Sequence, residues 1–147
     1  MTYRPIGVVR NRIREPRLTG WEDVRSDIFL LDEMEPALLG IEGFSHVIVV
    51  FHMDRIPLQA RPILRLPLAG ENDGEIGLFA TRVPARPNAI GVAVVPLLKR
   101  RKSVLRVRGL DALDGTPVLD IKPYLPTYDA VPGARLPDWA SRAQVEP

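Results

Sequence analysis

Two arginines in a stretch that also contains two prolines are the residues whose types and spacing could do chemistry. Arg82 and Arg86 lie in the stretch 77–91 (GLFATRVPARPNAIG), together with Pro84 and Pro87. Each proline fixes its own φ and disfavours helical geometry in the residue before it, so we expect a rigid, extended loop and no helix. A planar guanidinium on such a loop suits two-donor recognition of a carboxylate or phosphate. An ordinary surface connection with two solvated arginines is the alternative.

His52 is a second candidate, because it stands at the end of the apolar run 47–51 (VIVVF), where a strand meets a loop. A run of β-branched and aromatic residues without alternation predicts a strand buried on both faces. His46, at the start of the same run, is more typical of a structural histidine. Two histidines without paired carboxylates predict no metal site. A chain without cysteine has no disulfide, thiolate zinc site or cysteine nucleophile.

Clusters of cations are candidates for contact with phosphate. Arg10, Arg12 and Arg14 stand at i, i+2 and i+4, which would place them on one face of a strand. Residues 99–102 (KRRK) indicate a basic turn at the tip of a hairpin. Either cluster could meet a phosphate backbone or could be solvated. The net charge of +2 is small, so the distribution of charge matters more than its sum.

Several short segments have the composition of strands, and these must position the candidates. Alternation over 103–110 places Leu105 and Val107 on one face and Arg106 and Arg108 on the other. Asp120 and Lys122 share a face of a later strand. That strand is predicted over 118–124, and the other predicted strands are 6–9, 26–31, 47–52, 61–65 and 89–98.

Prolines limit the helices. Fifteen prolines in 147 residues are roughly twice the usual share of about 5%, which argues against long helices. Pro36 stands where a first helical residue is tolerated, and residues 37–39 add at most a turn or two. Short strands joined by fixed loops predict an all-β (mainly β) fold, namely a small, closed or nearly closed antiparallel β-barrel with short helical turns.

The length of the chain predicts a single domain. Prolines and small residues return over 125–138, and Trp139 indicates a late anchor. We therefore expect a domain over 1–140 and a frayed tail over 141–147. The first residues contain no apolar signal region, and no apolar run approaches the ~20 residues of a membrane helix. These features predict a cytoplasmic protein.

Three blocks of sequence resemble a known family. The stretch 77–91 resembles the central signature of the TsaA-like family, also called YaeB-like or TrmO-type. Residues 113–124 (LDGTPVLDIKPY) are similar to its second signature, and 43–46 (GFSH) before an apolar strand to its third. Together with 6–10 (IGVVR), these blocks cover nearly the whole chain in the family's order.

The resemblance implies a methyltransferase that uses S-adenosylmethionine, has a small antiparallel β-barrel and works as a homodimer. The acceptor implied is N6 of threonylcarbamoyl-adenosine beside the anticodon of tRNA. Met53, Val83 and Ala89 stand where the family commonly has glutamine, serine and proline. These departures keep a small-molecule acceptor as one alternative, and a non-catalytic S-adenosylmethionine-binding module is another.

The resemblance also implies the site residues. Arg82 would pair the methionyl carboxylate of the cofactor, and His52 or a nearby aspartate would be the general base. Asp111 and Asp114 would hold ribose hydroxyls or balance the sulfonium charge. The full cofactor set implied is Leu18, Thr19, Gly20, Phe51, His52, Arg82, Ile90, Asp111, Ala112, Leu113 and Asp114, in which Phe51 and Leu113 would flank adenine. The implied substrate residues are Arg86, Asn88, Lys122 and Tyr124.

Overall fold

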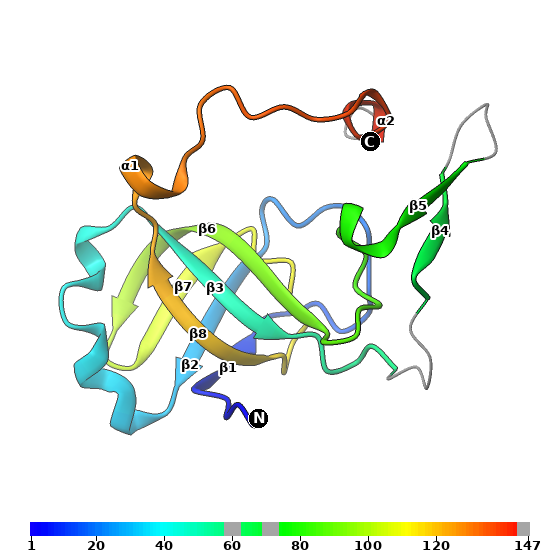
Figure 1. The fold of residues 1–147 in the computed structure, drawn as a ribbon. Coiled ribbons are helices and arrows are strands. Elements are labelled where there is room, and N and C mark those ends of the chain that lie inside the picture. The colour runs from blue at the N-terminus through cyan, green and yellow to red at the C-terminus, as the bar shows by residue number, and fades with distance from the viewer. Residues whose placement is uncertain (58–62, 69–73, 144–147) are drawn as a thin grey trace.

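Six antiparallel strands form a closed barrel in the computed structural model (Figure 1). The strand order is β1-β2-β7-β6-β3-β8, and β8 pairs back onto β1. The structure describes residues 1–57, 63–68 and 74–143. The barrel strands are β1 (Gly7–Arg10), β2 (Arg25–Leu30), β3 (His46–His52), β6 (Ile90–Arg101), β7 (Val104–Arg108) and β8 (Pro117–Pro123). The prediction of a small antiparallel β-barrel is confirmed.

The core lies inside the barrel, and β-strand alternation fills it. Val9, Ile28, Leu105 and Val107 point inward and have no exposed surface. The prediction that the β3 run is buried on both faces is wrong. Its residues alternate between buried and half-buried, because a closed barrel turns only one face of each strand away from solvent.

The hairpin of β6 and β7 differs in detail from the prediction. Alternation in β7 is confirmed, with Leu105 and Val107 buried and Arg106 and Arg108 exposed. The expected basic turn at 99–102 is wrong, because β6 continues to Arg101 and its last part, residues 97–101, pairs with β7.

Two residues, Lys102 and Ser103, make the turn of this hairpin. Lys102 has a φ of 52°, the left-handed geometry that tight hairpin turns require. The other three cations of the run are therefore displayed on strand β6 rather than on a loop.

The first basic cluster is also divided between strand and loop. β1 ends at Arg10, opposite Asp27 of β2, so Arg12 and Arg14 lie in the following loop and the expected single strand face is wrong. The strand expected over 61–65 falls partly on residues outside the described ranges. Arg65 begins β4 (Arg65–Pro67), which pairs only with β5 (Glu75–Gly77) and forms a hairpin outside the barrel.

Helical segments are short, as the prolines predict. They are the 3₁₀ helices η1 (Asp32–Leu38), η2 (Ile41–Gly43) and η3 (Leu78–Ala80), and the α-helices α1 (Pro126–Asp129) and α2 (Asp138–Ala143). Pro36 lies inside η1 rather than at its first position, because the acidic residues before it already form the first turn. η3 places a 3₁₀ turn ahead of Arg82, where no helix was expected.

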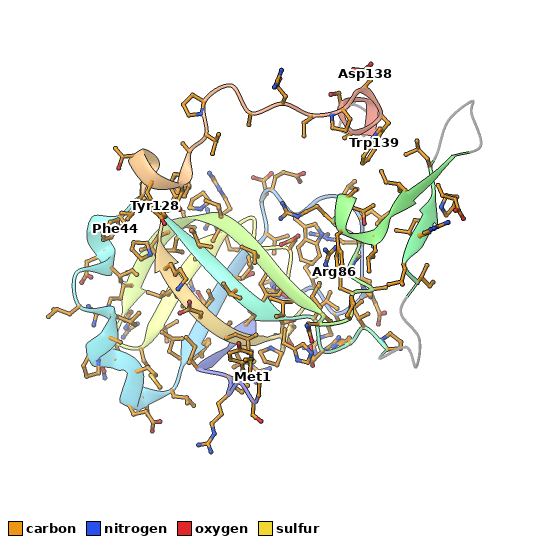
Figure 2. All side chains as sticks on the ribbon, in the orientation of Figure 1. Met1, Phe44, Arg86, Tyr128, Asp138 and Trp139 are labelled. Carbon is orange, nitrogen blue, oxygen red and sulfur yellow. The ribbon has the colours of Figure 1, made fainter. Side chains whose placement is uncertain are left out.

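The described part of the chain ends in α2, which runs past the expected domain boundary at 140. Trp139, labelled in Figure 2, is half-buried there. In the described residues, no helix is long and apolar enough to cross a membrane.

Candidate functional site

Three connections meet at one end of the barrel. β1, β3 and β7 finish at this end, and β2, β6 and β8 begin there. We call it the site end; in Figure 1 it is the right-hand end, where β4 and β5 project. The β1–β2 loop, the β3–β6 connection and the β7–β8 loop all lie at the site end, so every cofactor residue expected from the sequence is brought to it.

Asp114 joins two of these connections. The backbone N–H of Asn11 donates to its Oδ1 at 3.1 Å, and the guanidinium of Arg14 lies 3.5 Å from its Oδ2. Its own N–H donates to the carbonyl of Ile13 at 2.8 Å. Because Asp114 is only 8% exposed, its carboxylate is committed to holding the β1–β2 and β7–β8 loops together.

Asn11 and Arg55 complete this junction, and the sequence did not single them out. Asn11 Nδ2 donates to Ser26 Oγ at 2.9 Å and to the carbonyl of Ala112 at 2.8 Å. Arg55 donates to the carbonyls of Arg14 and Asp114, at 2.7 Å and 2.8 Å. Arg55 therefore ties the β3–β6 connection to the other two loops.

Asp111 differs from Asp114, because its side chain is exposed. It has no hydrogen-bond or ion-pair partner within the described ranges. Its neighbour Ala112 is buried and Leu113 half-buried, so Asp111 is the carboxylate of this loop that can reach a ligand. Gly109 and Gly115, with φ of 78° and 90°, allow the loop to turn sharply on either side.

Contacts within the β1–β2 loop hold residues 17–21 in a turn. The Arg17 guanidinium lies over the Trp21 ring at 4.8 Å, and Trp21 Nε1 donates to the Arg17 carbonyl at 3.1 Å. Arg17 also donates to the carbonyl of Gly20, which has a φ of 81°. This turn leaves the side chain of Leu18 fully exposed and Thr19 exposed beside it.

Phe51, His52 and Ile90 lie where β3 and β6 meet the site end. His52 pairs with Ile90, and both are exposed. Phe51 is 3% exposed and its ring packs against Gly91, so it fills the core and has only its backbone to offer a ligand. His52 and Ile90 are the side chains here that a ligand can reach.

The two arginines of the β3–β6 connection have different surroundings. Arg86 Nη1 donates to the carbonyl of Thr81 at 2.9 Å, and its guanidinium lies 5.8 Å from the Phe79 ring, so Arg86 shapes its own loop (Figure 2). Arg82 is exposed, and its one hydrogen bond within the described residues is a 3.3 Å contact from Nη2 to the Val92 carbonyl. Arg82 therefore keeps most of its donors for a ligand. Asn88, in the same connection, is also exposed.

Two expected substrate residues lie elsewhere. Lys122 and Tyr124 are at the far end of β8, opposite His46 and Ile48 at the start of β3, away from the site end. Lys122 Nζ lies 2.6 Å from Asp120 Oδ2, and this contact raises the pKa of Lys122. The prediction that the pair shares a face is confirmed, but the structure does not bring Lys122 or Tyr124 to the cofactor residues.

The candidate site is defined by its exposed side chains. Within the described residues, no group of three or more histidines or acidic residues could hold a metal ion. A hollow of about 320 Å³ lies on the β4–β5 hairpin, between Leu64, Arg65 and Ile76, and none of the expected cofactor residues lines it.

Comparisons with known proteins show the family to which this chain belongs. The family model of the tRNA-methyltransferase O N-terminal domain matches residues 10–130. A probable S-adenosyl-L-methionine-binding protein of Pyrococcus abyssi is 40% identical over 139 residues, with 91% of this chain and 73% of that protein covered. The tRNA (adenine(37)-N6)-methyltransferase of Escherichia coli is 37% identical, with 99% of this chain and 65% of the enzyme covered.

The fold is also shared with a solved structure. A crystal structure of TrmO superimposes on this chain with a TM-score of 0.74 at 38% sequence identity. The match covers 92% of this chain and 62% of the TrmO chain. The chain thus spans just under two thirds of the length of the methyltransferase from Escherichia coli and of the solved TrmO chain.

Proposed function

The chain belongs to the family of the tRNA-methyltransferase O N-terminal domain, and from this membership we infer that it transfers a methyl group from S-adenosylmethionine to N6 of an adenine in tRNA. We propose more specifically that the adenine accepting the methyl group is that of threonylcarbamoyl-adenosine beside the anticodon. The structural observation that carries the proposal is that Arg82, Asp111 and Ile90 all lie at the same end of the barrel and all have exposed side chains.

The exposed groups fit the chemistry of this cofactor. The guanidinium of Arg82 offers paired donors to the methionyl carboxylate. Asp111 offers carboxylate oxygens to ribose hydroxyls, and the apolar Ile90 and Leu18 offer surface to adenine. Asp114, which is committed to Asn11 and Arg14, acts by holding the loop that carries Asp111.

S-adenosylmethionine supplies the methyl group as a sulfonium electrophile. The acceptor N6 forms a bond to the methyl carbon while the carbon–sulfur bond breaks, and the N6 proton must leave. We assign that proton to the exposed imidazole of His52, at the end of β3. The displacement destroys the charge on sulfur, so the protein's main contribution is to position the reactants and exclude water.

A second candidate function is binding of S-adenosylmethionine without turnover. The observation that favours it is that the relative from Pyrococcus abyssi is named as a binding protein rather than as a transferase. Under this alternative the same site-end residues hold the cofactor, and no group has to accept a proton.

Labelled S-adenosylmethionine incubated with a tRNA pool and the protein tests the proposal. We expect label in tRNA, and digestion of that tRNA should place it on N6 of the threonylcarbamoyl-adenosine. Calorimetric binding of the cofactor with no label in tRNA would favour the binding module. If no heat is released at saturating cofactor, both candidate functions fail.

We also propose that the protein works as a homodimer in the cytoplasm. Support for the dimer comes from an apolar row on the outside of β6, where Val92 and Val94 are 46% and 51% exposed. Their partners on β3, Ile48 and Val50, extend this surface across the neighbouring strand. The location rests on the tRNA named as substrate of the Escherichia coli relative.

A further inference from the structure

The outer face of four neighbouring barrel strands carries an ordered array of cations that the proposed cofactor site does not use. Strand register places Arg10 beside Asp27, Asp27 beside Arg106, and Arg106 beside Lys99. Arg25 pairs with Arg108 in the same way. We call this array the basic face. It consists of the outward cations of β1, β2, β7 and the end of β6 that precedes the hairpin turn, namely Arg10, Arg25, Lys99, Arg101, Arg106 and Arg108.

The strands of the basic face carry a single carboxylate, Asp27, which lies among the six cations, and Arg10 also lies 3.9 Å from Asp114 Oδ2 in the adjoining β7–β8 loop. With both carboxylates counted, the six cations leave a local charge of +4, whereas the whole chain has a formal net charge of +2, so the rest of the chain carries −2. Positive charge is thus concentrated on one side of the barrel. A surface of this kind attracts a polyanion even when the net charge of the protein is small.

Asp27 also fixes the geometry of the face. Arg106 Nε donates to Asp27 Oδ1 at 2.7 Å, and Arg106 Nη2 donates to Oδ2 at 2.9 Å. This paired contact holds the guanidinium along the barrel surface between β2 and β7 and lowers the pKa of Asp27. Arg106 is therefore ordered before any ligand arrives, which reduces the entropy that binding must overcome.

An aromatic residue lies within the array. Phe29 is 45% exposed on β2, and with Val104 it forms the apolar part of a hollow of about 290 Å³. Lys99, Arg101 and Arg106 line the same hollow. An exposed ring surrounded by cations is the combination that holds a single-stranded nucleic acid, through stacking on one base and contacts with the neighbouring phosphates.

The basic face leads to the site end. Arg10, Arg25 and Arg108 lie where their strands meet the site end, whereas Lys99 and Arg101 lie toward the other end of the barrel. The four steps from Val104 to Arg108 cover roughly 13 Å along β7. An extended RNA strand that crosses this face therefore reaches the loops that carry the cofactor residues.

Protection against aggregation does not explain all of these cations. Outward charges guard the exposed edges of open sheets, and the last part of β6, which carries Lys99 and Arg101, pairs with β7 alone. Arg106, however, lies on β7, which has a hydrogen-bonded strand on each side, so edge protection does not explain the whole array. Uniform solvation does not explain them either, because the outward residues at the start of β6 are Ile90, Val92 and Val94.

We propose that the basic face binds the sugar–phosphate backbone of the RNA substrate, with Phe29 as the platform for one unstacked base. This docking surface rests on the proposed function in one respect, namely that the methyl acceptor is an RNA. It lies outside the cofactor site. Anionic backbone contacts are independent of base sequence, so this face supplies affinity, and the site end supplies the choice of the reacting base.

The first test is the double variant Lys99→Gln/Arg101→Gln, with Arg4→Gln as its control. Arg4 is an exposed cation that precedes β1, at the barrel end opposite the site end. Filter binding of a tRNA is measured at several salt concentrations. We expect the double variant to bind roughly tenfold more weakly, with a salt slope smaller by about 1.4, because each phosphate contact on a single strand contributes about 0.7. The control should match the parent.

A second variant should shift the affinity in the opposite direction. Asp27→Asn removes the one carboxylate of the basic face and keeps a side chain of the same shape, so we expect it to bind tRNA several-fold more tightly. A merely structural role for the Asp27–Arg106 pair predicts no gain. Calorimetry with S-adenosylmethionine should give the parent's affinity for both variants.

The outcomes separate this proposal from the proposed function. The docking surface is overturned if the parent binds no tRNA, or if the double variant keeps the parent's affinity and salt slope. Methyl transfer to tRNA with unchanged binding by the double variant would remove the basic face and leave the function intact. Weaker binding by the double variant, without methyl transfer by the parent, would leave the basic face and remove the function.

Discussion

Asp111 and Asp114 stand three residues apart in one loop, yet only Asp111 has an exposed side chain. We expect Asp114→Ala to lower the free energy of unfolding by about 1–3 kcal/mol, because it leaves the Asn11 N–H without its acceptor. Asp111→Ala should leave the free energy of unfolding within about 0.5 kcal/mol of the parent. It should lower the affinity for S-adenosylmethionine. Urea unfolding and calorimetry check the two effects. The division of roles is wrong if Asp114→Ala unfolds like the parent.

Arg82 is exposed and has a single long contact, to the Val92 carbonyl at 3.3 Å, within the part of the chain that is described. Lysine keeps its charge but loses the planar fork that pairs a carboxylate. We expect Arg82→Lys to cost about 1.5–3 kcal/mol, or roughly ten- to a hundredfold in affinity for S-adenosylmethionine. Arg106→Lys, on the outer face of β7, is the control and should leave that affinity unchanged. Equal calorimetric affinities for Arg82→Lys and parent would make the stretch 77–91 an ordinary surface connection.

At the scale of elements, β3 and β6 are packed too closely for a side chain at Gly91. A Cβ there would lie 2.3 Å from Phe51 Cε2, and that ring is 3% exposed. We expect Gly91→Ala to destabilise the barrel by about 1–3 kcal/mol through overpacking. Gly77→Ala is the control, because nothing lies within 4 Å of its added Cβ. A urea midpoint for Gly91→Ala equal to that of the control would show that the ring can move aside.

The pairing of β2 with β7 has a dependence on pH. Hydrogen bonding to Arg106 lowers the pKa of Asp27 below the ordinary value of 3.8. The pair therefore contributes stability above that value, and the contribution is lost as the pH falls through the lower pKa of the folded state. We expect parent and Arg106→Gln to differ in thermal midpoint at about pH 7, and to converge only as the pH falls below 3.8 and through the lower pKa of the folded state. A difference that persists unchanged in acid would exclude the pair as its cause.

Element types could be predicted from local sequence, but their partners could not. Alternation in 103–110 fixes which side of β7 is buried, and dense prolines exclude long helices. Asn11 and Asp114 are 103 residues apart, and no local pattern shows that the backbone of one meets the carboxylate of the other. Lys122 was expected beside the substrate but lies at the barrel end opposite the site end. This too could not be read from local sequence, because the direction in which β8 runs is set by its pairing with β3.

At the scale of the whole molecule, the barrel has two contrasting sides. The basic face covers the outside of β1, β2 and β7, whereas apolar residues occupy the outside of β3 and the first half of β6. This second surface also explains why the run 47–51 is apolar throughout, although only alternate residues enter the core. Exposed apolar residues gathered on one surface are typical of an interface between proteins.

The contrast predicts which surface closes a homodimer. In a two-fold interface each copy presents the same patch, so every acidic residue introduced there is buried twice, once on each copy. We expect light scattering to give a dimer for the parent at micromolar concentration and a monomer for Val92→Glu/Val94→Glu. Leu39→Glu is the control, since Leu39 is 86% exposed just after η1, outside this surface, and should stay dimeric. A monomeric parent would end the homodimer proposal, and a dimeric double variant would move the interface away from β3 and β6.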